Sequence, residues 1–134
     1  MRSASAVLLL VLLTGCVSTL EPTFDGPVYP EGLAKLDTLD VQAQIGDHDL
    51  TLTSGMARLA GPGTLWINRW FAAEIEAIEP GERRVVALDR FRDENGLPPR
   101  GGGFFATKDR TEIVLVELVT EAGVHGLRLL GARD

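Results

Sequence analysis

Three consecutive residues, Asp47, His48 and Asp49, carry the side chains that most often bind transition metals and zinc. Neighbouring side chains on a β-strand point to opposite faces, so these three cannot converge on one ion. His125 would have to join them from a distant strand. The sequence therefore predicts a turn aspartate beside a histidine at the edge of the core, with no metal site and no cofactor.

A second candidate is the alternating set Trp66, Asn68 and Trp70, in a segment with the period of a strand. If the period holds, the three share one face, with the two indoles about 13–14 Å apart and an amide between them. Such a row can stack against a sugar chain or a peptide. Aromatic side chains of small β domains more often fill the core, so solvent exposure decides between the two interpretations.

The remaining polar residues do not assemble into a catalytic set. Residues 100–104 are rich in glycine but lack the lysine and following helix of a phosphate-binding loop. Neither G-x-S-x-G nor H-E-x-x-H occurs, and two histidines are the only bases suited to neutral pH. Two carboxylate pairs alternate with apolar residues as solvated strand faces do: Glu74 with Glu76, and Glu112 with Glu117. We therefore predict no catalytic residue and a non-enzymatic protein.

The first sixteen residues carry the clearest signal. Arg2 supplies a positive charge, residues 6–13 are an unbroken apolar run, and Thr14, Gly15 and Cys16 follow Leu13. The run is too short to span a bilayer, which needs about 20 apolar residues in a helix, but it suits the apolar region of a secretory signal. The four residues 13–16 closely resemble the lipobox of bacterial lipoproteins.

This resemblance implies a signal peptide of residues 1–15, cleavage between Gly15 and Cys16, diacylglycerol on the Cys16 sulfur and acylation of the new amino group. Two or more chains anchor stably, since each buried methylene contributes about 0.8 kcal/mol. An ordinary cleaved signal with a free Cys16 thiol is the alternative. Val17, where an aspartate would imply inner-membrane retention, implies the outer membrane, facing the periplasm. We expect an anchored protein of the bacterial cell envelope.

Charge and cysteine content exclude other classes. The chain has 13 basic and 19 acidic residues, a net charge of −6, which argues against a nucleic-acid partner. Removal of residues 1–15 takes away Arg2 and leaves −7, so anionic headgroups would repel the domain and the lipid must hold it. A single cysteine excludes an internal disulfide.

Periodicity predicts one β domain over residues 36–134, after an extended lipidated spacer over residues 16–35 that is rich in proline and glycine. Residues 39–45 and 48–53 alternate, and a turn at Gly46 and Asp47 would place Ala43 opposite Leu50. Residues 79–82 have a type II turn signature and predict a hairpin between strands at 71–79 and 85–88.

Residues 92–103 read as a long polar loop, followed by a short strand at 104–107. Residues 113–119 are apolar on both faces except at Glu117, as in a central strand, and residues 124–130 close the domain. Eight or nine short strands predict an all-β fold, a small antiparallel β-sandwich or barrel.

Three functions fit these expectations. The first is a membrane-anchored lipoprotein whose β domain binds an envelope protein or supports assembly without catalysis. The second is a periplasmic carrier of a hydrophobic small molecule inside a barrel, which requires an apolar cavity of several hundred cubic ångströms. The third is a protein that binds or hydrolyses cell-wall polymer, with Trp66 and Trp70 as subsites. The sequence favours them in that order.

Overall fold

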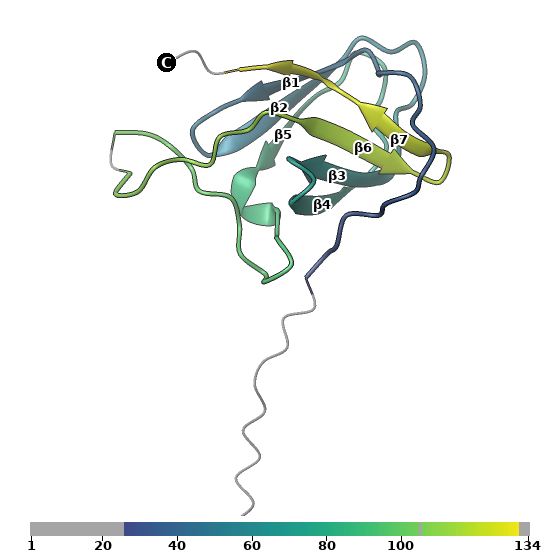
Figure 1. The fold of residues 1–134 in the computed structure, drawn as a ribbon. Helices are drawn as coiled ribbons and strands as arrows, with labels where there is room; N and C mark the ends of the chain where they lie inside the picture. Colours follow the sequence, from purple (N-terminus) through teal and green to yellow (C-terminus); the bar gives the residue numbers. More distant parts are fainter. Residues whose placement is uncertain (1–25, 105, 132–134) are drawn as a thin grey trace, which may run out of the picture.

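The computed structural model describes residues 26–104 and 106–131, which form a sandwich of two four-stranded sheets (Figure 1). Sheet 1 contains, in spatial order, β5 (Arg83–Ala87), β2 (Asp49–Ser54), β1 (Val41–Ile45) and β8 (Arg128–Leu130). Sheet 2 contains β4 (Phe71–Ile75), β3 (Gly63–Ile67), β6 (Val116–Thr120) and β7 (Gly123–Gly126). The only helical element in the described residues is a 3₁₀ turn, η1 (Leu88–Arg90). The all-β sandwich is confirmed; the leader and Cys16 lie outside the described residues.

The core lies between the two sheets and follows the alternation of the sequence. In β1 the apolar side chains are buried and the glutamines between them are exposed, the pattern of a strand with one solvated face. Sheet 2 contributes the facing layer. Fully buried side chains from both sheets meet there, among them Val41, Leu50, Leu52, Leu65, Ile67, Val86, Val116 and Leu118. These side chains occupy the interior that a hollow carrier would leave open.

The β1–β2 hairpin forms as predicted, but its register differs by two residues. Ala43 lies opposite Leu52, and Ile45 lies opposite Leu50. The Gly46 amide donates to the Asp49 carbonyl at 2.9 Å, so the two residues between these partners are Asp47 and His48, and the turn lies one position later than predicted. A shift of two residues keeps every side chain on its predicted face, which is why the alternation could not distinguish the two registers.

The chain crosses between the sheets more often than predicted. The turn at residues 79–82 is present, with the Glu82 amide donating to the Glu79 carbonyl and Gly81 at φ +73°. However, β4 lies in sheet 2 and β5 in sheet 1, so this turn ends a crossover and the predicted hairpin is wrong. The fold is also not purely antiparallel, because β8 pairs with β1 in parallel.

Two segments without regular strands complete the domain. Residues 26–36, called the strap here, run from Glu94, whose carbonyl accepts from Gly26, to the edge of β7, where Lys35 bridges Val124. Figure 1 shows this purple segment passing from the lower end of the domain to the β6–β7 turn. The predicted spacer is thus packed on the domain over its described part.

The second segment is the connection between η1 and β6, residues 91–115, which contains the predicted loop and extends beyond it. The short strand predicted at 104–107 is absent from the residues described there, and Phe104 is 95% exposed. The strand predicted at 113–119 begins only at Val116.

Candidate functional site

A buried polar cluster lies beneath the strap, on the outer face of sheet 2. Trp66 of β3 and Glu117 of β6 are cross-strand partners, and each is only 3% exposed. Their neighbours Leu65 and Leu118 point into the core, so Trp66 and Glu117 must point outward. The strap therefore buries the part of the outer face of sheet 2 that carries Trp66 and Glu117.

Tyr29 of the strap makes the central contact. Its ring meets Trp66 edge to face, with centroids 5.3 Å apart, and its hydroxyl donates to Glu117 Oε1 at 3.1 Å. Arg69 Nε also donates to Glu117 Oε1, at 2.8 Å, and the Arg69 guanidinium carbon lies 5.2 Å from the centre of the Tyr29 ring. A buried carboxylate requires such partners, because removal of a charge from water is costly unless it is paired and hydrogen-bonded.

The protonation states are fixed by the same contacts. Burial, followed by the negative charge of Glu117 and the hydrogen bond to it, raises the pKa of Tyr29 above 10.0. The hydrogen bond to Glu117 and its charge raise the already high pKa of Arg69. Both shifts favour a neutral phenol and a charged guanidinium around the carboxylate. Neither shift brings the pKa of Tyr29 or of Arg69 closer to neutral pH.

The turn between β3 and β4 positions Arg69. Asn68 and Arg69 adopt φ of +53° and +56°, and the Trp70 amide donates to the Ile67 carbonyl at 3.0 Å, the arrangement of a tight hairpin turn. Asparagine tolerates this left-handed region, but for arginine it costs about 1–2 kcal/mol. The ion pair with Glu117 accounts for an arginine at this position.

The side chain of Asn68 forms hydrogen bonds within the domain and is not presented to a ligand. Its side-chain amide donates to the Glu112 carbonyl at 2.6 Å, and its Oδ1 accepts from the amides of Val114 and Leu115 at 2.9 and 3.2 Å. These bonds attach the turn to the end of the 91–115 connection. The predicted row of Trp66, Asn68 and Trp70 therefore does not exist, because β3 ends at Ile67 and Trp66 is buried.

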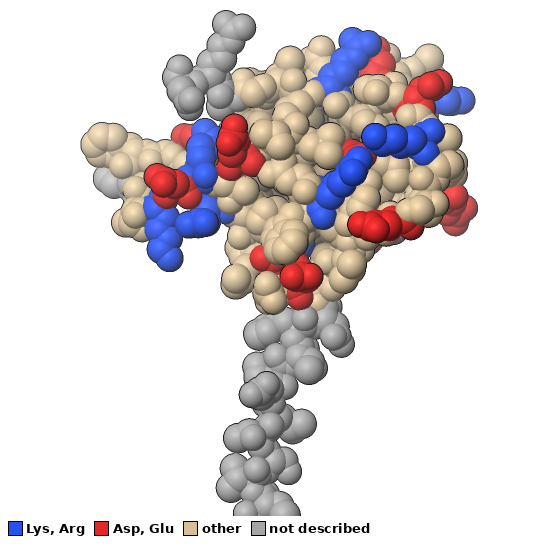
Figure 2. Space-filling model, viewed as in Figure 1, with Lys and Arg blue, Asp and Glu red and all other residues tan. Residues whose placement is uncertain are grey.

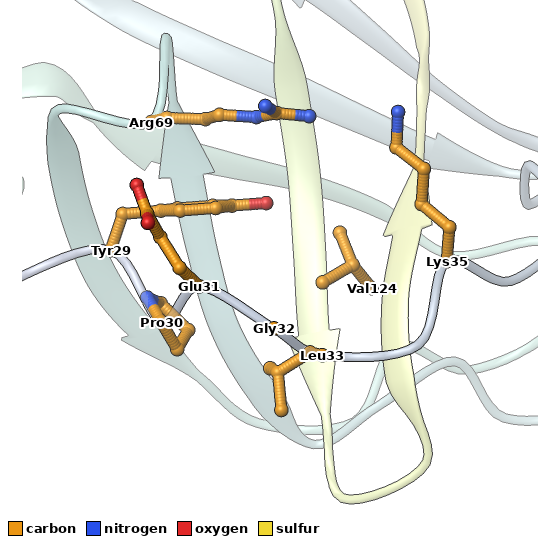
Figure 3. A pocket seen from close by; sticks show the side chains of 8 residues that line it. All are labelled: Tyr29, Pro30, Glu31, Gly32, Leu33, Lys35, Arg69 and Val124. Carbon is orange, nitrogen blue, oxygen red and sulfur yellow. The ribbon is translucent and has the colours of Figure 1, made fainter.

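A pocket of about 360 Å³ lies beside this cluster, between the strap and β7. In Figure 3 the side chains of Arg69 and Lys35 extend toward one another above Val124, with the Tyr29 ring beneath Arg69. Arg69 is already neutralised by Glu117, and the exposed Glu31 on the rim offsets Lys35. The pocket therefore offers no net charge with which to hold an anion.

Trp70 belongs to a different region. It is 49% exposed and lines a groove of about 680 Å³ together with residues of the 91–115 connection. Five exposed residues of this groove, Trp70, Leu97, Pro98, Arg100 and Lys108, are called the loop-end surface here. Of the predicted binding row, only Trp70 is available to a ligand.

The Asp47, His48 and Asp49 segment connects β1 and β2 and does not form a ligand set. Asp47 accepts from the Gly102 amide through its carbonyl, and its carboxylate lies 3.9 Å from Arg110. His125 is on β7, in the other sheet, where its Nδ1 lies 2.9 Å from the Asp37 carbonyl. Within residues 26–104 and 106–131, no three His, Cys, Asp or Glu side chains gather as a metal site.

Sequence reasoning missed Tyr29 and Arg69 as cluster members and took Glu117 for a solvated residue. The signal for Glu117 was present, because it is the one charged residue in an otherwise apolar run at 113–119. A carboxylate on a strand buried on both faces requires a cation, but the sequence does not indicate which of the basic residues supplies it.

Comparison of the chain with protein-family models, with curated proteins and with solved structures found no match. No helix in the part of the chain that the structure describes is both long and apolar enough to cross a bilayer.

Proposed function

We propose that this protein is a lipid-anchored component of the bacterial cell envelope whose β domain binds another envelope protein without catalysing a reaction. The anchor would be Cys16, within the residues 13–16 that resemble a lipobox. The proposal of a binding role depends on one observation, the open outer edge of β5.

The backbone pairing of β5 with β2 leaves one side of β5 unpaired. The Leu88 amide donates to the His48 carbonyl, and the Ser54 amide donates to the Glu82 carbonyl, so the even-numbered residues between them face β2. The amides and carbonyls of Arg83, Val85 and Ala87 therefore point away from the sheet. Among the described residues, none pairs with this edge.

An edge of this kind can accept an added strand. Main-chain hydrogen bonds would supply affinity, and the exposed side chain of Val85 would supply an apolar contact. The edges of sheet 2 are less accessible, since the strap bonds to Val124 of β7 and Arg92 bridges Ala72 of β4. Sheet 1 is thus the favoured side for a partner.

The anchor is tested by blocking lipoprotein signal peptidase and by Cys16→Ser in the full-length chain. Either treatment should leave an unprocessed precursor, so no new amino group forms at residue 16 for acylation. Normal processing of Cys16→Ser, with release of the protein into aqueous fractions, would contradict a lipid anchor.

The binding edge is tested with Val85→Pro and its control Val85→Thr. Proline removes the outward amide of residue 85 without disrupting the β2–β5 bonds, whereas threonine keeps it. In envelopes cross-linked and analysed by mass spectrometry, one stoichiometric protein should be recovered with the threonine variant and lost with the proline variant. Equal recovery with both folded variants would place the partner elsewhere.

A further inference from the structure

The loop-end surface combines exposed apolar and cationic side chains. Trp70 and Leu97 are 49% and 60% exposed, and Pro98 lies beside them. Arg100 and Lys108 line the same groove, and within the described residues neither side chain forms an ion pair. This surface offers an amphipathic indole, apolar contacts and two available positive charges.

Local hydrogen bonds hold this surface in place. Asp93 Oδ1 accepts from the amides of Asn95 and Leu97, both at 2.9 Å, which fixes the turn that carries Leu97. The Arg100 amide donates to the Thr111 hydroxyl at 2.8 Å, and the Arg100 carbonyl accepts from the Thr111 amide at 3.0 Å. The surface therefore requires little ordering before it makes a contact.

Charge is distributed unevenly over the domain. Residues 89–112 contain five basic and five acidic residues, whereas the other described residues contain six basic and eleven acidic. Figure 2 shows acidic and basic side chains interspersed on the viewed face, with uncharged surface between them. The segment that carries the loop-end surface is therefore the part of the domain that an anionic surface repels least.

The described chain begins beside this surface. The Gly26 amide donates to the Glu94 carbonyl at 3.1 Å, on the turn that also presents Leu97. Only nine residues separate Gly26 from Cys16, and an extended chain over these ten residue steps spans at most about 36 Å. If Cys16 is the lipid anchor, the loop-end surface lies within that distance of the bilayer.

We propose that the loop-end surface contacts the anionic phospholipid surface in which the chain is anchored, with Trp70 and Leu97 at the interface and Arg100 and Lys108 on headgroup phosphates. Tryptophan favours the boundary between apolar and polar lipid regions, and basic side chains favour anionic headgroups. This inference rests on the proposed anchor.

If the chain is anchored at Cys16, a weak contact is sufficient to hold the loop-end surface on the bilayer. One indole, one leucine and two cations bind a bilayer weakly by themselves, and Glu94 beside them opposes binding. Attachment to the same membrane through a short segment, however, raises the effective concentration at the surface into the millimolar range. The contact would then set the orientation of the domain rather than its attachment.

The test attaches the chain to vesicles independently of natural lipidation. Residues 16–134 contain one cysteine, so Cys16 can be coupled to a maleimide-bearing lipid in vesicles of phosphatidylglycerol and brominated phosphatidylcholine. Trp66→Phe leaves Trp70 as the only indole and keeps an aromatic ring against Tyr29. Transfer of Trp70 from water to the interface should then shift its emission to shorter wavelength, and bromine in the acyl chains should reduce that emission by roughly half relative to unbrominated vesicles.

Leu59→Trp, in a chain with Phe at positions 66 and 70, is the matched control. Leu59 is exposed and precedes β3, whereas Trp70 follows it, so the two lie at opposite ends of the sandwich. The introduced indole should keep its emission. If Trp66→Phe does not fold, the difference between the unmodified chain and Trp70→Phe isolates the same signal, because Trp66 is shielded.

Three results would overturn the inference. The first is quenching of Trp70 no greater than that of the Leu59→Trp control. The second is quenching unchanged by the double variant Arg100→Glu, Lys108→Glu. The third is a Trp70 signal that responds to cell-wall fragments or to an envelope protein but not to vesicles. Failure of natural lipidation at Cys16 would refute the anchor alone, because the coupled chain does not require it.

Discussion

Trp66 and Trp70 are four residues apart in the sequence and lie in two regions of opposite character. Trp66 is buried beneath the strap, beside the ion pair between the exposed Arg69 and the buried Glu117. Trp70 is half-exposed in a groove whose cations have no ion-pair partner among the described residues. The tight turn at Asn68 and Arg69 separates the two regions, since it ends β3 between the two indoles.

The comparison shows how similar side chains acquire different roles. In the strap cluster, each charge is matched within the fold, so its chemistry holds the N-terminal segment in place. On the loop-end surface, hydrogen bonds to backbone amides and carbonyls fix the conformation, and the side chains remain available to a ligand. The strap cluster is therefore expected to control stability, and the loop-end surface to control binding.

The largest expected difference between the regions is in stability. Trp66→Ala removes a buried indole and its contact with Tyr29, and should lower the free energy of unfolding by about 3–5 kcal/mol. Trp70→Ala removes a half-exposed indole and should cost about 1 kcal/mol or less. Urea denaturation followed by circular dichroism measures both. Equal losses of unfolding free energy would show that the strap cluster contributes no more to stability than the loop-end surface does.

Removal of one partner of the Arg69–Glu117 ion pair should cost more stability than removal of the other. Arg69→Ala leaves the Glu117 carboxylate buried without its cation, whereas Glu117→Gln leaves an exposed arginine and a side chain that still accepts from Tyr29. Arg69→Ala should therefore lower the melting temperature more than Glu117→Gln. The double variant should be more stable than Arg69→Ala alone, and additive losses would count against a charged Glu117.

Asn68 joins the two regions, and its replacement should have an intermediate effect. Asn68→Ala removes three hydrogen bonds and places alanine in the left-handed region, at a cost of about 2–3 kcal/mol. Asn68→Gly also removes the bonds but adopts φ of +53° without strain, so its loss should be about 1 kcal/mol smaller. Thermal unfolding of the two variants separates strain from hydrogen bonding.

The smallest expected effect depends on pH. The folded state raises the pKa of Tyr29 by burial and by the charge and hydrogen bond of Glu117, so folding favours the neutral phenol. The resulting stability is present below pH 10.0, the unperturbed value, and is lost as the pH rises through the raised pKa. Tyr29 is the only tyrosine, so tyrosinate absorbance reports its ionisation directly.

Tyr29→Phe supplies the control for this alkaline loss. It should show a shallower decline of melting temperature above pH 10.0, because phenylalanine has no hydroxyl proton to lose. An identical decline in the two proteins would mean that the phenol is not held by Glu117.

The sequence predicted the elements whose pattern depends on local physics. The alternation in β1 and β2 identified a hairpin and its buried face, and Pro80 with Gly81 identified the turn before β5. Both predictions use periods or dihedral preferences that a few neighbouring residues determine. Strand pairing was not predicted correctly, because neither the register of β1 with β2 nor the sheet that β5 joins is determined by neighbouring residues.

The candidate sites were harder to predict because they depend on distant residues. Glu117 is buried by Tyr29, 88 residues away in the sequence, and is neutralised by Arg69, 48 residues away. The end of β3 at Ile67 depends on bonds from Asn68 to the backbone near residue 114. Without those contacts, the alternation of Trp66, Asn68 and Trp70 predicted a continuous strand.

The path of the strap has a mechanical consequence. A pull on the chain from its N-terminal side would be applied first at the Gly26–Glu94 bond, then at Tyr29, and only afterwards at β1. The chain could therefore peel away from the sandwich in steps and lengthen while both sheets stay closed. Force spectroscopy would register this as an early extension at low force, one that Tyr29→Ala shifts to still lower force.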